Sequence, residues 1–201
     1  MVREDQRRRL IGAVATALAD NGYAQLTVQQ IVSAAHVSRR TFYEHFDNTQ
    51  DALVSAHDDA AERLVAAIAR DCRRLGEWPS QVRAALAATL GFAASEPHLA
   101  QLLTFNAVAF EPPLATRVDD SHERFAAMLR SGRDHYPEAA SLPKLTERFL
   151  VGGVLAIVAK GIAKGEHRGL PKLEPHLLKL ILLPYLGSAE ARRIAMPSAE
   201  S

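Results

Sequence analysis

Proline and glycine divide this chain into segments of helical length, and no segment alternates apolar and polar residues as a half-buried strand does. Alanine and leucine, which favour helices, abound between these breaks. The sequence therefore predicts an all-α fold. We expect helices over residues 3–19, 27–35, 38–46, 49–75, 80–94, 97–109, 113–132, 143–164 and 171–185, with breaks at Asn21-Gly22, Gly76, Pro97, Pro112-Pro113, Pro137, Pro143 and Pro171.

Composition narrows the class of protein further. Of the 201 residues, 48% are hydrophobic, which is enough for a packed core and excludes wholesale disorder. Lys and Arg number 24 against 23 Asp and Glu, so any nucleic-acid site must be a local patch. The longest apolar run, Phe149 to Ala159, has 11 residues and is too short to span a bilayer. We therefore expect no membrane partner.

The single cysteine, Cys72, excludes an internal disulfide and a CxxC metal site, and it favours a reducing, cytoplasmic location. Arg7-Arg8-Arg9 followed by apolar residues 10–19 resembles a secretory signal. However, Glu4 and Asp5 are unusual in the basic start of a signal, and the helical spacing of Leu10, Val14 and Leu18 favours an amphipathic first helix.

The most informative segment is residues 27–46. Thr27 with Gln30 three residues later is capping-box chemistry, and Ser38 is a good N-cap for a second short helix after a turn at His36-Val37. Two short helices joined by such a turn make a helix-turn-helix. An apolar seam would pack them on each other and on the first helix: Val28, Ile31, Val37, Phe42 and Phe46.

The outward residues of this segment are suited to reading DNA. Arg39 and Arg40 begin the second helix, where a recognition helix presents its base-contacting groups, and an arginine fork can bond guanine O6 and N7 together. Hydroxyls and free backbone N–H groups at the helix starts can bind phosphates. We predict these DNA-binding residues: Thr27, Gln29, Ser38, Arg39, Arg40, Thr41, Tyr43 and His45. The alternative is a solvated helix face, with simple edge packing for Tyr43 and His45.

Residues Leu26-Thr27 to Phe46, ending Thr41-Phe42-Tyr43-Glu44-His45-Phe46, resemble the signature of the TetR/AcrR family of bacterial transcriptional regulators. The resemblance covers about residues 7–55. It implies a homodimer that binds a palindromic operator in double-stranded DNA. It also implies a C-terminal helical domain that binds a small-molecule effector or a partner subunit.

Three positions depart from the family pattern. His36 stands where the family usually has Gly, so a left-handed backbone position must hold a side chain. Val32 replaces a smaller residue between the two helices, and Thr49 replaces a Lys that often contacts phosphate. Residues 1–50 hold six Arg against five acids, which predicts modest phosphate affinity per subunit.

The rest of the chain is divided into a helical effector-binding and dimerisation domain, residues 51–193, and a flexible tail, residues 194–201, after the DNA-binding domain of residues 1–50. Aromatic and Met residues on successive helices suggest a cavity, although plain core is an equal alternative. The predicted pocket residues are Ile68, Leu102, Phe105, Asn106, Phe110, His122, Phe125, Met128 and Phe149.

The final helices are apolar on more than one side, and a helix of this kind requires two partners. Small residues upstream would let another helix approach closely, so a four-helix dimer interface is predicted. Its residues are Gly153, Ala156, Ile157, Leu177, Ile181 and Pro184. The alternative is a buried central helix hairpin.

No Gly-rich phosphate loop, HExxH or GxSxG motif occurs, so we expect neither an enzyme nor a cofactor or metal site. Asp119, His122 and His98 are interpreted as a polar surface, and Cys72 as an inert thiol rather than a redox sensor. The prediction is a sequence-specific DNA-binding regulator, a repressor released by a small, largely apolar ligand. The alternatives are a helical enzyme or carrier, and an adaptor that keeps the helix-turn-helix as scaffold.

Overall fold

The computed structural model describes residues 2–22, 25–105 and 112–196, and these form helices with no strand, so the all-α prediction is confirmed. The helices are α1 (Val2–Asn21), α2 (Val28–Ala35), α3 (Arg39–Tyr43), α4 (Thr49–Cys72), α5 (Trp78–Ser95), α6 (Pro97–Leu103), α7 (Leu114–Arg130), α8 (Gly132–His135), α9 (Thr146–Ala163) and α10 (Glu174–Ala195). Two 3-10 helices, η3 (Pro137–Ser141) and η4 (His167–Leu173), come before α9 and α10. In these described ranges, no helix is long and apolar enough to cross a membrane.

Several helix ends differ from the predicted ones, among them the C-terminal ends of α3, α6 and α10. Helix α3 stops at Tyr43 because Glu44 already caps it, whereas the prediction carried it to residue 46. Helix α6 ends at Leu103, and the remainder of the predicted segment lies partly outside the described residues. Helix α10 extends past the predicted end at residue 185, but Gly187 has φ 73 and ψ 172, so the chain kinks there between two helical stretches.

By contacts the chain separates into two compact units. Unit 1 comprises residues 1–63 and 96–119, and unit 2 comprises residues 64–95 and 120–201. The sequence placed a single boundary near residue 50. The structure instead groups α6 with the helix-turn-helix, because α6 packs on α1.

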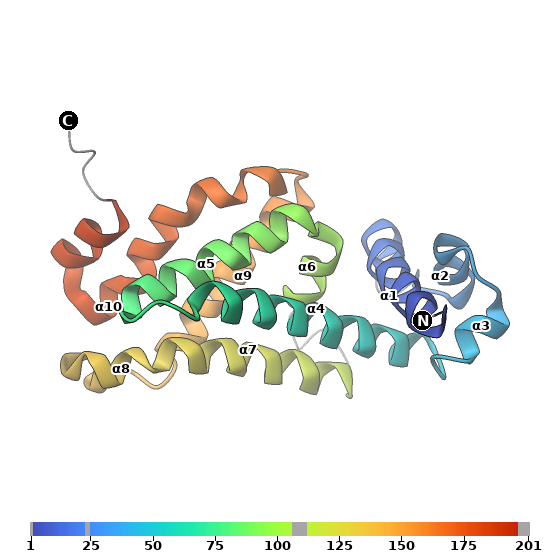
Figure 1. The fold of residues 1–201 in the computed structure, drawn as a ribbon, viewed down its shortest axis with the longest axis horizontal. Coiled ribbons are helices and arrows are strands. Elements are labelled where there is room, and N and C mark those ends of the chain that lie inside the picture. The colour runs from blue at the N-terminus through green and yellow to red at the C-terminus, as the bar shows by residue number, and fades with distance from the viewer. Residues whose placement is uncertain (1, 23–24, 106–111, 197–201) are drawn as a thin grey trace. The chain divides into compact units, whose positions relative to one another are not determined.

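Unit 1 is built on the buried face of α1. Leu10, Val14 and Leu18 are at most 2% exposed, as their helical spacing predicted. Ile31 of α2 and Phe42 of α3 are fully buried too, and α1, α2 and α3 lie side by side in Figure 1. Burying these side chains stabilises a domain in which α2 and α3, with 8 and 5 residues, are too short to be stable alone.

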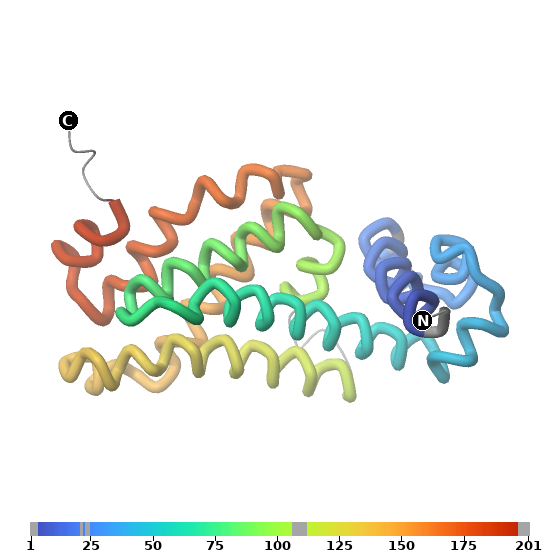
Figure 2. Tube along the Cα trace, viewed as in Figure 1, coloured from blue at the N-terminus to red at the C-terminus, as the bar shows by residue number. Residues whose placement is uncertain are grey.

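Unit 2 is a helical layer of α5, α9, α10 and the 3-10 segment η4, which packs on both α5 and α9. Figure 2 traces the chain from α9 through η4 into α10. Gly161 of α9 has no room for a side chain, since a Cβ there would lie 2.7 Å from Leu170 Cδ2. Gly132 similarly lies against the Trp78 ring, with a Cβ only 2.4 Å from Cζ2. These close approaches fix the helices of unit 2 against one another.

Candidate nucleic-acid interface and ligand cavities

The first helix of the motif begins at a complete capping box. The Thr27 hydroxyl accepts a hydrogen bond from the Gln30 backbone N–H at 3.3 Å, and the Gln30 side-chain oxygen accepts one from the Thr27 N–H at 2.9 Å. Both donors are among the groups that a helix start leaves unsatisfied. The cap predicted from the Thr27-Gln30 spacing is therefore confirmed.

The turn between α2 and α3 has the left-handed residue that the sequence predicted. His36 has φ 51 and ψ 47, and its N–H is directed to the Ser33 and Val32 carbonyls at the end of α2. The Val37 N–H also donates to Val32 O, at 3.1 Å. An imidazole thus occupies a conformation that glycine adopts more easily. Val32 is buried, so the larger side chain is accommodated between the helices.

Ser38 is the N-cap of α3, and its hydroxyl accepts a hydrogen bond from the Thr41 N–H at 3.0 Å. The orientation of this short helix is set by Phe42, which is fully buried and packs on Phe46 with ring centroids 5.6 Å apart. Because Phe42 faces inward, Arg39 and Arg40 lie on the exposed side. The sequence-predicted arrangement of an inward aromatic pair and outward arginines is what the structure shows.

The remaining predicted DNA contacts divide into exposed and covered groups. Gln29 is exposed, and Tyr43 is 54% exposed while its ring packs edge-on against Phe42 at 5.3 Å. Thr41 is half-buried, with its hydroxyl 3.0 Å from the Ser38 hydroxyl. His45 is also half-buried, and its Nε2 atom is covered by protein. The surface available to DNA is therefore formed chiefly by Gln29, Arg39, Arg40 and Tyr43.

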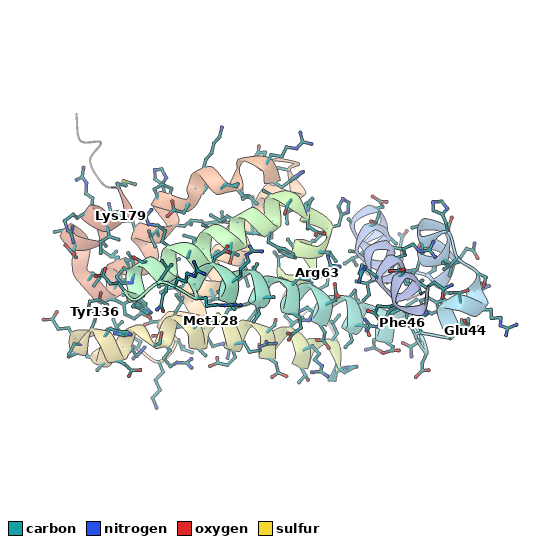
Figure 3. All side chains as sticks on the ribbon, viewed as in Figure 1. Glu44, Phe46, Arg63, Met128, Tyr136 and Lys179 are labelled. Carbon is teal, nitrogen blue, oxygen red and sulfur yellow. The ribbon has the colours of Figure 1, made fainter. Side chains whose placement is uncertain are left out.

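Arg40 makes a side-chain contact that was not predicted from the sequence. Its Nε donates to Glu44 Oε1 at 3.2 Å, one helical turn further along the chain. The side chains remain 90% and 50% exposed. Figure 3 shows Glu44 on the outer side of the motif. The i,i+4 spacing of opposite charges is the signal that would have identified this pair.

Unit 2 contains an apolar cavity of about 80 Å³. Fourteen residues of α4, α5, α7, α9 and α10 line it: Leu64, Ile68, Val82, Ala85, Leu86, Thr89, Phe125, Met128, Leu129, Leu150, Val151, Val154, Leu155 and Ile181. Thr89 is the only polar residue of this set, and its hydroxyl is occupied by a bond to Ala85 O at 2.8 Å. This lining can accept an apolar ligand and offers it little polar recognition.

A second cavity of about 310 Å³ shares five lining residues with the first: Ile68, Val82, Ala85, Met128 and Leu129. Its other walls bring polar groups from Cys72, Gln81 and Ser131. Because the two cavities share a wall, an elongated ligand in both would have an apolar end in the smaller cavity and a polar end in the larger. Met128 is labelled in Figure 3.

Of the predicted pocket residues, Ile68, Phe125 and Met128 line the first cavity. Leu102 and Phe105 belong to unit 1, His122 is not part of the lining, and Phe149 is 79% exposed. Asn106 and Phe110 lie outside the described residues. The prediction favoured aromatic residues, whereas the cavity walls are mostly aliphatic and small side chains of α4, α5 and α9, such as Val82 and Ala85.

The residues predicted for the dimer interface differ in how far they are exposed to solvent. Gly153 and Ala156 are exposed on α9, while Ile157 and Pro184 are half-buried. Leu177 and Ile181 are only 5% and 4% exposed, so they pack inside the unit and are not available to a partner. The large exposed apolar side chains of α10 are instead Leu180 and Leu183, and Leu173 at the end of η4 is exposed as well.

Cys72 does not have the properties of a reactive thiol. Burial, followed by the nearby Asp71 carboxylate, raises its pKa above the ordinary value, and its Sγ is 3.4 Å from Gln81 O. A raised pKa reduces the thiolate fraction at neutral pH. In the residues that the structure describes, no three His, Cys, Asp or Glu side chains are grouped as metal ligands.

Unit 1 contains a capped helix-turn-helix, and two exposed arginines lie on its second helix. This arrangement is typical of helix-turn-helix DNA-binding proteins. Residues 10–56 match the profile of the bacterial regulatory proteins of the tetR family. The N-terminal segment therefore matches the DNA-binding domain of a family of bacterial transcriptional regulators.

Individual relatives agree with this assignment. The nucleoid occlusion factor SlmA of Serratia proteamaculans is 27% identical over 134 residues, which span 64% of this chain and 66%, just under two thirds, of that protein. The fatty acid degradation regulator FadR of Bacillus halodurans has a TM-score of 0.75 at 20% identity, covering 87% of this chain and 97% of that one. FadR of Bacillus subtilis, in complex with stearoyl-CoA, has a TM-score of 0.71 at 18% identity, covering 90% and 98%. At these identities the two structures indicate a shared fold.

Proposed function

We propose that this regulator is a sequence-specific repressor, that two copies bind a palindromic operator, and that a small, largely apolar ligand releases them. The observation that carries the DNA-reading part is the orientation of α3. Phe42 is fully buried below it, and Arg39 and Arg40 are exposed above it. A short helix held in this way can enter a major groove with its first residues against base edges.

The ligand part of the proposal is supported by the two adjoining cavities of unit 2. The smaller, at about 80 Å³, takes only a small apolar group, and the larger, at about 310 Å³, extends the space toward polar residues. A short apolar chain with a polar end suits this lining. The stearoyl-CoA in the Bacillus subtilis FadR structure favours the same class of ligand, although a chain of that length would require the cavities to widen here.

Release by a ligand requires two separate sites and a difference in affinity between two states of the protein. The cavities are formed by residues of unit 2, and the reading helix α3 belongs to unit 1. DNA and ligand therefore do not compete for the same residues. A coupling of about 1–3 kcal/mol, or roughly 5–150-fold in operator affinity, would suffice for release.

The homodimer is supported by exposed apolar residues on two helices of unit 2. Leu145 and Phe149 are 70% and 79% exposed, and Gly152, Gly153 and Ala156 follow them on α9. Leu180 of α10 is 55% exposed. Large apolar side chains that protrude together with small residues are typical of a surface that a second helix pair covers.

The deciding experiment selects bound sequences from a random duplex pool and measures each base pair by competition. We expect one recurrent palindromic motif. Arg39→Ala or Arg40→Ala should each lose about 1–3 kcal/mol of discrimination at a single base pair per half-site. Tyr43→Phe keeps the ring on Phe42 and removes only the exposed hydroxyl, so it should weaken all duplexes about equally. If the double arginine variant keeps the full base preference, α3 is not the reading helix.

A further inference from the structure

Arg40 and Glu44 are held in register by the end of α3 itself. The Glu44 backbone N–H donates to Arg40 O at 3.0 Å, so the two residues are fixed one turn apart, and the Arg40 Nε donates to Glu44 Oε1 at 3.2 Å. Phe42, between them in sequence, is fully buried and sets the rotation of the turn. The pair therefore lies on the same exposed face that we assign to the DNA groove.

The atoms used by the pair determine what remains for a base. A guanidinium has five N–H donors in a planar fork, and Glu44 occupies the one on Nε. The other four N–H groups are on the two terminal nitrogens, and one from each nitrogen forms the parallel pair at the end of the fork. A bidentate bond to guanine O6 and N7 requires two parallel donors of this kind. Glu44 thus restricts the rotation of a long, 90% exposed side chain while leaving its recognition edge free.

Stability does not explain a carboxylate at this position. An exposed i,i+4 ion pair stabilises a helix only slightly. A negative charge on the reading helix is also unfavourable for every duplex, because DNA is a polyanion. Unit 1 has little positive charge to offset it, since residues 1–63 and 96–119 hold eight Lys and Arg against twelve Asp and Glu. The placement is favourable only if the carboxylate improves a base contact by more than it weakens phosphate binding.

The two arginines of α3 differ in this respect. Arg39 is exposed, and it has no ion pair with any residue that the structure describes. It can therefore turn toward a phosphate or a base. Arg40 is oriented before DNA arrives, so less side-chain freedom is lost when it binds.

We propose that Glu44 is a specificity-determining positioning residue, which orients the Arg40 fork for one guanine of each half-site and lowers the affinity for all other DNA. This inference rests on the proposed DNA-reading function of α3. Glu44 acts through Arg40 and need not touch a base.

The test uses the full chain and duplexes that carry the selected operator or a single substituted base pair. Arg40→Ala should lower discrimination at one guanine by about 5- to 150-fold. Glu44→Gln should lower it at the same guanine by at least about 3-fold, a part of the same bidentate contact. It should also raise affinity for random DNA and steepen the dependence on salt. In the Arg40→Ala background, Glu44→Gln should have no further effect on discrimination.

Asp47→Asn is the matched control, because it removes another exposed carboxylate of unit 1 beyond the end of α3. It should raise affinity for all duplexes and leave the base preference unchanged. A loss of discrimination by Glu44→Gln that is spread over all base pairs, or that persists without Arg40, overturns the proposal. Arg40→Ala without effect at any base pair overturns it too, while Arg39→Ala can still support the reading function. A wild-type chain that selects no sequence overturns both.

Discussion

Glu147 is a single carboxylate that unit 2 buries completely, with 0% of its side chain exposed. Arg133 donates two hydrogen bonds to this carboxylate, from Nε to Oε1 at 2.7 Å and from Nη2 to Oε2 at 3.0 Å. The Tyr185 hydroxyl donates a third, to Oε1 at 2.9 Å. Arg133 also donates to the Leu142 and Pro143 carbonyls, both at 2.9 Å. Burial alone would raise the pKa of Glu147, but the bonds from Arg133 and Tyr185 outweigh it and lower the pKa below its usual 4.5.

Glu147→Gln should lower the free energy of unfolding at neutral pH, because Arg133, whose side chain is 17% exposed, loses its charged partner and the cluster inside unit 2 loses its carboxylate. The lowered pKa fixes the pH dependence. The extra stability is fully present above pH 4.5, the unfolded value, and is lost as the pH falls through the lower folded value. Urea unfolding at several pH values checks this, with exposed Glu138→Gln as control. A variant as stable as wild type at neutral pH would contradict it.

At this scale the sequence predicts residues whose role is decided by their immediate neighbours. Thr27 caps α2 and His36 adopts a left-handed conformation because each depends on a few adjacent backbone atoms. The Glu147 cluster was not predicted, since Arg133 and Tyr185 meet it only through the tertiary fold. A Glu in an apolar helix gives no indication of which distant partner satisfies it.

At the scale of elements, the exposed faces of α9 and α10 decide the assembly. Phe149→Glu should convert the proposed dimer to a monomer, because each copy would bury an unpaired charge at a cost of about 3–5 kcal/mol. Phe149 is 79% exposed, so the fold of the isolated unit should be unaffected. Sedimentation velocity measures the mass, and circular dichroism measures the helix content.

Ala127→Glu is the control for this variant, since it adds the same charge to an exposed position of α7. It should remain dimeric. If Phe149→Glu sediments as a dimer with native helix content, the interface lies on another surface. Ile181→Glu is unsuitable for this purpose because Ile181 is buried and lines the cavity, so the chain would unfold.

The positions of most helices in the sequence were predictable, but which side of each helix faces the core was not always predictable. The Pro and Gly breaks located α5, α7 and α9, whereas α10 is apolar around most of its circumference. Periodicity alone could not decide which side of α10 faces inward, so Leu177 and Ile181 were assigned to an interface although they are buried. Helix α3 was oriented correctly because two aromatic residues one turn apart define a single inward face.

At the scale of the whole molecule, the proposed release from DNA depends on the length of apolar chain that the two adjoining cavities can hold. Straight-chain alcohols of increasing length should bind with rising affinity, by up to about 4-fold for each CH₂ buried, until the two cavities are filled. The hydroxyl end can bond the polar residues of the larger cavity. Thermal-shift titrations measure the affinities, and affinity should level off or fall for longer chains. Affinity that is independent of chain length would exclude an elongated site.

Ala85→Phe tests the coupling of this site to DNA, because Ala85 lines both cavities. The added ring should fill the space beside the shared wall and abolish stabilisation of the protein by the alcohols. Operator affinity should then no longer respond to them. Ala87→Phe places the same ring at an exposed position of the same helix and should keep the response. In the wild type, a ligand that binds the DNA-free state about 100-fold more tightly should weaken operator binding by about the same factor. Alcohols that stabilise the wild type yet leave its operator affinity unchanged would show that the cavities do not control DNA binding.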